Sequence, residues 1–231
     1  MKFNGHDFTN LLVVESIERS LMPSIYNRSK TIPDKIGSYF TDSNVGNGQI
    51  IVRCRIIKDT RYEVQETVRE VAGLLYSKEP RKLELRDEPS LYNMAILSGM
   101  SDVGKYLHTG YVELMFECHD PFAYGLLELE KKLNEPFEYR GGHSTPGIID
   151  LLAPSDDLMV ISNGNKEIKL IYPFDGTQKV HVDLEKQNIT INNNNAMKYL
   201  TLDSDFFTIS PGKNIITTNG EGVIKYRNRW L

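Results

Sequence analysis

The stretch GYVELMFECHDPFAYG, residues 110–125, decides the fold class of this chain. From residue 111 to 118, apolar side chains occupy every second position, and most of the intervening side chains are polar. The first set is Val112, Leu114, Phe116 and Cys118, and the second is Tyr111, Glu113, Met115 and Glu117. A period of two residues predicts a β-strand that buries one face. We therefore expect a fold that is mainly β.

Two polar residues, His119 and Asp120, close this strand just before Pro121. They could form a metal or acid/base pair, but an Asp at such a position commonly accepts hydrogen bonds from turn amides. We favour the structural interpretation. The other histidines, His6, His108, His143 and His181, also occur in no motif associated with hydrolysis.

The segment GQIIVRCRII, residues 48–57, predicts a second half-buried strand. Val52, Cys54 and Ile56 share one face, whereas Arg53 and Arg55 share the other. KLELRDEP, residues 82–89, predicts a further strand, and LLELEKKL, residues 126–133, suits either a short helix or a strand.

A helix is predicted between these strands. Thr60 and Glu63 have the spacing of a capping box, in which each side chain accepts a hydrogen bond from the other residue's backbone amide. Apolar residues follow at helical spacing, and the helix should end before Pro80. These residues are Val64, Val68, Val71, Ala72 and Leu75.

The C-terminal part of the chain has a different character. Short alternating runs at 166–172, 179–185 and 188–191 are separated by turn residues such as Asn192–Asn195, which is typical of an antiparallel β-sandwich. Glycine and proline cluster between 134 and 147. We place the domain boundary there, with one domain over 1–138 and a second over 139–231.

The segment from Pro23 to Gly48 has scattered aromatic residues and no sustained period. It is longer than the connections that compact domains usually tolerate. An extended arm or long hairpin that packs on a neighbouring subunit would bury its apolar residues, and a mobile surface loop is the alternative. The candidate inter-subunit residues are Ile25, Tyr26, Ile32, Tyr39 and Phe40.

DFFTISPGKNIITTNG, residues 205–220, contains a Gly-Lys pair that suggests a phosphate loop. The upstream glycine of that motif is missing, and Asn214 stands where Ser or Thr is required. Pro211–Gly212 fits a type II turn instead. We predict that this turn joins strands at 206–209 and 214–217.

Composition excludes several functions. The 231 residues carry a net charge of −4, which gives no basic field for nucleic acid or membrane binding. No apolar run approaches ~20 residues, and no signal peptide is present, so we expect synthesis in a cytoplasm.

Cys54 and Cys118 fit buried hydrophobic positions. No motif for a catalytic nucleophile, a metal or a cofactor occurs, and we expect none of the three.

Together these segments resemble the distal tail proteins of siphophages, the Dit or phage tail family. The most specific match is 110–125, which is similar to a family strand ending in Cys-x-Asp-Pro-aromatic-Ala-Tyr. FNGHDFTNLLVV, TIPDKIGSYF, the helix at 61–76 with EPRKLELRDEP, FTISPGKNIIT and IKYRNRWL follow in family order. Asp34-Lys35 departs from the family's common Gly-Arg, so the local turn there is expected to differ.

The resemblance implies an N-terminal β-sandwich or split-barrel-like domain with one helix and a long arm hairpin, then a galectin-like or jelly-roll sandwich. It implies a structural, non-enzymatic role in the virion tail tip, encoded by a phage or a prophage. Members form a ring, usually a hexamer, between the tail tube protein and the tail-tip hub protein, and receptor-binding proteins can attach.

A carbohydrate-binding module is the alternative function. The C-terminal sandwich could hold sugar on aromatic side chains such as Tyr172, Phe174 or Tyr199. The same residues could equally be part of the core or rim of the sandwich.

Overall fold

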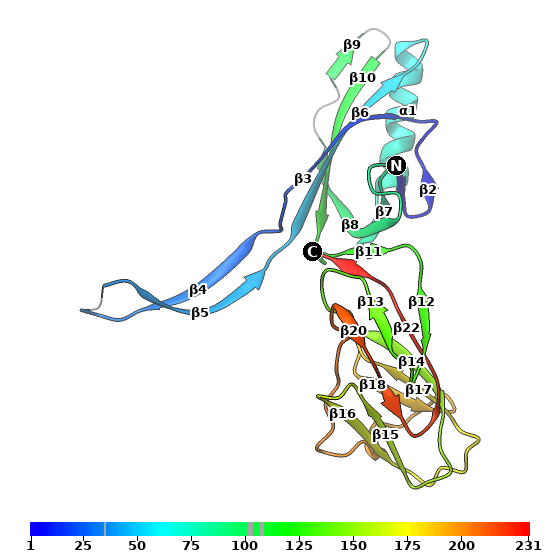
Figure 1. Cartoon of the computed structure of the whole chain (residues 1–231). Coiled ribbons are helices and arrows are strands. Elements are labelled where there is room, and N and C mark those ends of the chain that lie inside the picture. The colour runs from blue at the N-terminus through cyan, green and yellow to red at the C-terminus, as the bar shows by residue number, and fades with distance from the viewer. Residues whose placement is uncertain (35, 101–103, 107–108) are drawn as a thin grey trace. The chain divides into compact units, whose positions relative to one another are not determined.

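A computed structural model describes residues 1–34, 36–100, 104–106 and 109–231 (Figure 1). Lys35 and His108 lie outside the described residues. The chain divides into two compact units, Met1–Ala123 with Leu231, and Tyr124–Trp230. The division thus falls after Ala123 rather than after residue 138.

The first unit is built on an antiparallel sheet in the order β2-β1-β7-β8-β10-β6-β3, with β9 paired to β10. In chain order the strands are β1 Lys2–Phe3, β2 His6–Asp7, β3 Val13–Arg19, β6 Gly48–Ile57, β7 Arg81–Glu84, β8 Leu91–Met100, β9 Gly104–Tyr106 and β10 Thr109–Cys118.

The centre of this sheet is the pairing of β6 with β10. Their register runs without interruption from Thr109 opposite Ile57 to Cys118 opposite Gly48. Val52 lies opposite Leu114 and Cys54 opposite Val112, and all four side chains are buried. The predicted alternation of both strands is confirmed.

The helix α1, Arg61–Leu75, packs on this apolar face. The Thr60 side chain accepts a hydrogen bond from the Glu63 amide at 3.2 Å, and Glu63 accepts one from the Thr60 amide at 3.0 Å. This confirms the capping box. The helix buries Val64, Thr67, Val71 and Leu75.

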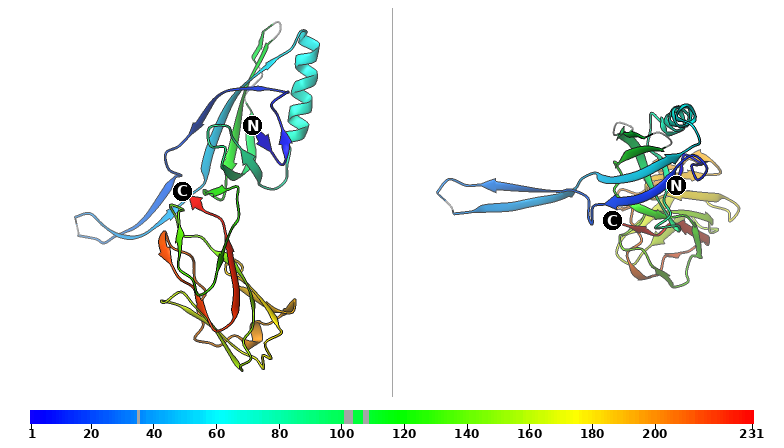
Figure 2. Two further views of the ribbon diagram at one scale, coloured as in Figure 1. Left: turned by 45° about the vertical axis from the view of Figure 1, so that its right-hand side comes forward. Right: turned by 90° about the horizontal axis from the view of Figure 1, so that it is seen from above.

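The segment between β3 and β6 forms a two-stranded hairpin, β4 Ile25–Thr31 with β5 Ser38–Val45 (Figure 2). We call it the arm. At its base the Gly46 amide donates a hydrogen bond to the Ser24 carbonyl oxygen at 2.6 Å. Near its tip, Asp34 has a φ of 63°, in the left-handed region that Gly favours. Asp34 therefore adopts a backbone conformation that glycine favours.

The second unit is a β-sandwich, in which a six-stranded sheet in the order β12-β22-β14-β17-β18-β19 shares one core with the sheet β16-β15-β21. The strands β13 and β20 form a separate two-stranded sheet, and β11 pairs with β23. The elements are β11 Ala123–Gly125, β12 Leu129–Lys132, β13 Phe137–Tyr139, β14 Gly147–Leu152, β15 Leu158–Ser162, β16 Glu167–Ile171, β17 Lys179–Asp183, β18 Asn188–Ile191, β19 Asn194–Asn195, the 3₁₀ helix η1 Met197–Tyr199, β20 Gly212–Asn214, β21 Thr217–Thr218, β22 Glu221–Tyr226 and β23 Arg229–Trp230.

Strand pairing explains where the unit boundary lies. The segment that suited either a helix or a strand is β12, and its Leu129 pairs with Tyr226 on β22. Phe137 on β13 pairs with Asn214. Both β12 and β13 therefore take their strand partners from the C-terminal part of the chain.

The positive φ predicted for Gly212 is confirmed, because this residue has a φ of +96°. However, β20 begins at Gly212 and pairs with β13, while Ile209 bridges to Thr145. The predicted hairpin of 206–209 with 214–217 is therefore wrong, because both segments pair with distant strands.

The thiols of Cys54 and Cys118 should be inert in the folded chain. Burial raises the pKa of Cys54 to about 12 and that of Cys118 to about 11, and both side chains are free and almost fully buried. At about pH 8, Ellman's reagent should label neither thiol before unfolding and both afterwards. A Ser43→Cys variant, with its thiol on the exposed arm, is the positive control. Native labelling of Cys54 or Cys118 at the control's rate would contradict this assignment.

Two substitutions in α1 should change its stability in opposite directions. Thr60→Ala removes the capping box and should lower the free energy of helix opening by about 1 kcal/mol. Gly73 is exposed, and no described atom lies within 4 Å of an added Cβ, so Gly73→Ala should raise that free energy by about 0.5–1 kcal/mol. Hydrogen exchange of the α1 amides measures both, and changes of the same sign would show that one account is wrong.

Candidate assembly surfaces

The five residues proposed for inter-subunit contact all lie on the arm. Their exposed fractions are 46% for Ile25, 62% for Tyr26, 42% for Ile32, 50% for Tyr39 and 68% for Phe40. Every described residue of β4 and β5 is exposed. Both faces of the ribbon are therefore open to a partner.

Strand register divides these residues between the two faces. Ile25 lies opposite Val45, and Ser29 lies opposite Phe40. Ile25 and Ser29 are four positions apart along β4, so their side chains point to the same face. Lys30 lies opposite Tyr39, and Tyr26 opposite Asn44. Because residues directly opposite share a face, one face carries Ile25, Phe40 and Val45. The other carries Tyr26, Arg28, Lys30, Tyr39 and Asp42.

A register shift after Arg28 makes this division possible. Arg28 pairs with Asp42, but the next residue, Ser29, pairs with Phe40, so Thr41 is an extra residue in β5. Such a bulge moves the following side chains of one strand to the opposite face. Phe40 therefore joins Ile25, whereas an unbroken register would put Tyr39 there. Ile32 lies beyond the last paired residue, Thr31.

The sheet of the first unit also has an open face, opposite α1. There Arg53 on β6 is held between Glu18 on β3 and Glu113 on β10, with Nε 2.8 Å from the Glu113 carboxylate. These partners, first Glu113 and then Glu18, raise the pKa of Arg53. Arg55 Nε lies 2.9 Å from Glu15.

Exposed apolar side chains surround this ladder of charges. Val13 and Tyr111 lie on either side of Arg55 in the register, and Ile57 follows on the same face of β6. Their exposed fractions are 40% or more. We call Val13, Ile57 and Tyr111 the sheet patch.

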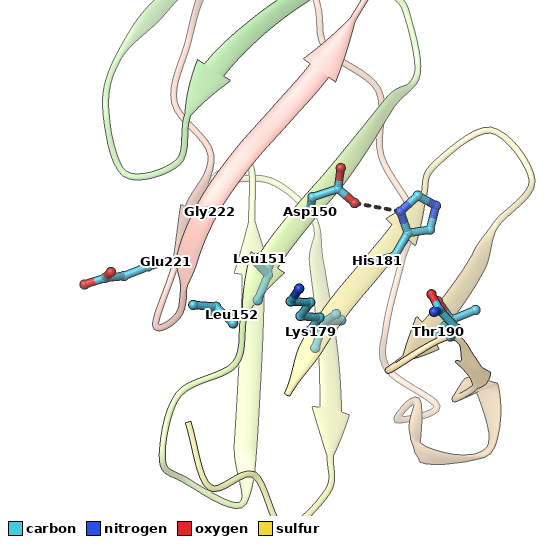
Figure 3. Close-up of a pocket in the computed structure, with 10 residues that line it drawn as sticks. Asp150, Leu151, Leu152, Lys179, His181, Thr190, Glu221 and Gly222 are labelled. Atoms are coloured by element: carbon cyan, nitrogen blue, oxygen red, sulfur yellow. Dashed lines mark hydrogen bonds and ion pairs between the residues drawn. The ribbon is translucent and has the colours of Figure 1, made fainter. Parts of the chain in front are cut away.

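The second unit has a groove on the outer face of its six-stranded sheet (Figure 3). Asp150 on β14 lies directly opposite His181 on β17, and its Oδ1 is 2.7 Å from the His181 Nδ1. Lys225 on β22 donates a hydrogen bond to the other carboxylate oxygen at 2.8 Å. Burial raises the pKa of Asp150, but hydrogen bonds from Lys225 and His181 outweigh it, so the pKa is lowered.

The aromatic residues considered for sugar binding pack together instead. Tyr172 contacts Phe174 and Tyr199, with ring centroids 5.0 Å and 4.8 Å apart. Phe174 is buried, and both tyrosines pack on the core of the sandwich. The three rings therefore belong to the core and its rim.

Asp120, which was considered for a metal or acid/base pair, has a structural role. Asp120 accepts a hydrogen bond from the Phe122 amide at 3.2 Å, which is the turn role predicted for it. Among the described residues, no group of three metal-binding side chains comes together, and no helix is long and apolar enough to cross a membrane.

Sequence reasoning found the arm but missed its organisation and the groove. Val45 was not predicted, because only the register of the arm shows that it lies opposite Ile25. Asp150, His181 and Lys225 are far apart in the sequence and meet only through the pairing of β14 with β17 and β22. Each of these three polar residues alternates with buried residues along its strand, and this alternation was the local signal that they share the outer face of the sheet.

Known proteins resemble both units. Residues 6–118 match the model of the phage tail protein RIFT-related domain, and residues 141–230 match that of the siphovirus-type tail component, C-terminal domain. The distal tail protein of Bacillus phage SPP1 is 22% identical over 225 residues, covering 93% of this chain and 88% of that protein.

Solved structures show the same fold. The crystal structure of Dit from phage SPP1, described as a paradigm of the hub adsorption apparatus in phages that infect Gram-positive bacteria, has a TM-score of 0.87 at 20% identity, covering 99% of this chain and 98% of that one. A chain of the phage P2 baseplate in its activated conformation has a TM-score of 0.51 at 10% identity, with coverage of 98% and 93%. With both units matched in order, the chain belongs to the siphophage distal tail protein family.

Proposed function

We propose that this chain is a tail hub protein whose copies close into a ring, with six the expected number. The ring connects the tail tube protein to the tail-tip hub protein or baseplate, and receptor-binding proteins attach at its periphery. The family membership supports the tail role, and the exposed arm is the observation that carries the assembly.

The arm is not expected to be stable without a partner surface. A two-stranded ribbon is marginal in water, and three or more strands or a packed face are needed for independent stability. This ribbon exposes Ile25, Phe40 and Val45 on one side. Covering them on a neighbouring copy would supply the missing burial, at roughly 25 cal/mol per Å² of apolar surface.

The sheet patch is a suitable contact surface for the arm of a neighbouring copy. Ile25 and the residue opposite Phe40 are four positions apart, about 13 Å along a strand at ~3.3 Å per residue. In the sheet patch, Val13 and Tyr111 lie on the two strands next to Arg55, about 10 Å apart, and Ile57 is two positions further along β6. The apolar side chains of the arm and of the sheet patch therefore extend over roughly 10–13 Å.

Contact between an arm and a different surface of the next copy is head-to-tail. Such contacts generate a closed ring when the rotation between copies closes. The chain therefore needs no second kind of interface to form a ring. Its role is structural, and we assign it no catalytic residue, metal or cofactor.

The site of action is the tail tip of the virion. The tube protein and the tail-tip hub protein would bind the two faces of the ring. Neither nucleic acid nor a membrane is an expected partner, because the net charge is −4. Binding of the purified chain to each recombinant tail protein tests these partners.

Charge placed on the apolar face of the arm should dissociate the ring. Ile25→Asp with Phe40→Asp would bury uncompensated carboxylates in the interface, and the midpoint concentration of assembly should rise at least about tenfold. Light scattering and negative-stain microscopy measure this. Leu202→Asp, at a fully exposed position of the second unit, is the control and should still form rings. A wild-type chain that stays monomeric at every concentration would refute the ring.

Assembly should also protect the arm from hydrogen exchange. In the dilute monomer, amides of β4 and β5 should exchange far faster than those of β6 and β10, since an isolated ribbon opens easily. At concentrations where rings form, the arm amides should slow, while those of β15 in the second unit stay unchanged as the internal reference. Rings in which the arm exchanges as fast as in the monomer would remove the arm from the interface.

A further inference from the structure

The outer face of the six-stranded sheet carries a feature that ring assembly does not use. Its groove has a volume of about 570 Å³ and is lined by residues of β14, β17, β18 and β22 and by Asn193. Pockets for small ligands usually measure about 300–1,000 Å³, whereas a protein partner needs roughly 800 Å² of surface on each side. The groove is therefore of the size for a small ligand.

Its polar groups are held in place by their neighbours. Lys225 and His181 fix the Asp150 carboxylate from two sides, at 2.8 Å and 2.7 Å. His181 uses Nδ1 for this bond, which leaves Nε2 on the other side of the ring, as Figure 3 shows. Thr190 lies opposite His181 on the next strand and adds a hydroxyl. Acceptors and donors thus stand side by side on one face.

The charges in the groove balance. Asp150 is neutralised by Lys225, and the lining adds one ammonium, Lys179, and one carboxylate, Glu221. Lys179 and Glu221 lie on either side of Leu152 in the register, and Leu152 is 44% exposed. A ligand in the groove would contact the apolar Leu152 between a hydrogen-bond donor, Lys179, and an acceptor, Glu221. Because the charges balance, the groove has no net electrostatic field that favours an anion or a cation.

We infer that this groove binds a neutral polyhydroxylated ligand, a saccharide. Each sugar hydroxyl can both donate and accept a hydrogen bond, which matches the mixture of Asp150, His181, Thr190 and Asn193. Leu152 offers an apolar surface to the C–H groups of the sugar ring. The site is separate from the aromatic cluster of Tyr172, Phe174 and Tyr199, none of which lines it.

Saturation-transfer NMR on the full-length chain tests this inference, with lactose, maltotriose and N,N′-diacetylchitobiose as probes. At least one should show ring-proton saturation and a saturable titration at millimolar concentrations. Asp150→Asn removes a charged acceptor, and Thr190→Val removes the hydroxyl at nearly constant volume. Each should weaken binding about tenfold. Asp203→Asn, which alters an exposed ion pair with Lys169 outside the groove, should bind as the wild type does.

Two results would overturn the inference: binding by none of the three sugars, or equal binding by wild type and both groove variants. Cross-linking of Lys179 to a tail protein in assembled particles would instead identify the groove as a protein-docking surface and also overturn it. Microscopy of the same samples keeps this test separate from ring formation, because the groove variants leave the arm and the sheet patch unchanged.

Discussion

The pairing of β6 with β10 is the constraint on which the first unit depends. Buried positions alternate along both strands, and in the observed register the buried residues of one strand lie opposite those of the other. A slip by one residue would turn one strand's apolar set to solvent. The register that buries Val52 against Leu114 therefore also creates the face that receives α1. It sets the ladder of Arg53, Glu18 and Glu113 on the opposite face.

Local signals in the sequence were sufficient for the elements whose partners are close or whose pattern is strong. The alternation in 111–118, the capping box at Thr60 and the positive φ expected at Gly212 all rest on interactions within a few residues. The partner of Gly212–Asn214 was not predictable in this way. It is β13, more than seventy residues earlier, and the choice between two possible partners depends on how the whole sandwich closes.

The same distinction applies to the surfaces. The five arm residues could be named because a long polar and aromatic segment without a period needs something to pack on. Their division between two faces depends on one extra residue, Thr41, and a bulge of this kind has no marker in the local sequence. Asp150, His181 and Lys225 could not be grouped beforehand, since each is an ordinary polar residue on its own strand. Only the sheet order brings them together.

The arm is inserted between two strands that are themselves partners, β3 and β6. It therefore has two covalent roots, and both enter the same antiparallel ladder. When both roots move together, the hydrogen bonds between β3 and β6 move with the arm, and the ten-residue pairing of β6 with β10 holds it to the rest of the sheet. The strand pair at the centre of the first unit is therefore also the anchor of the arm.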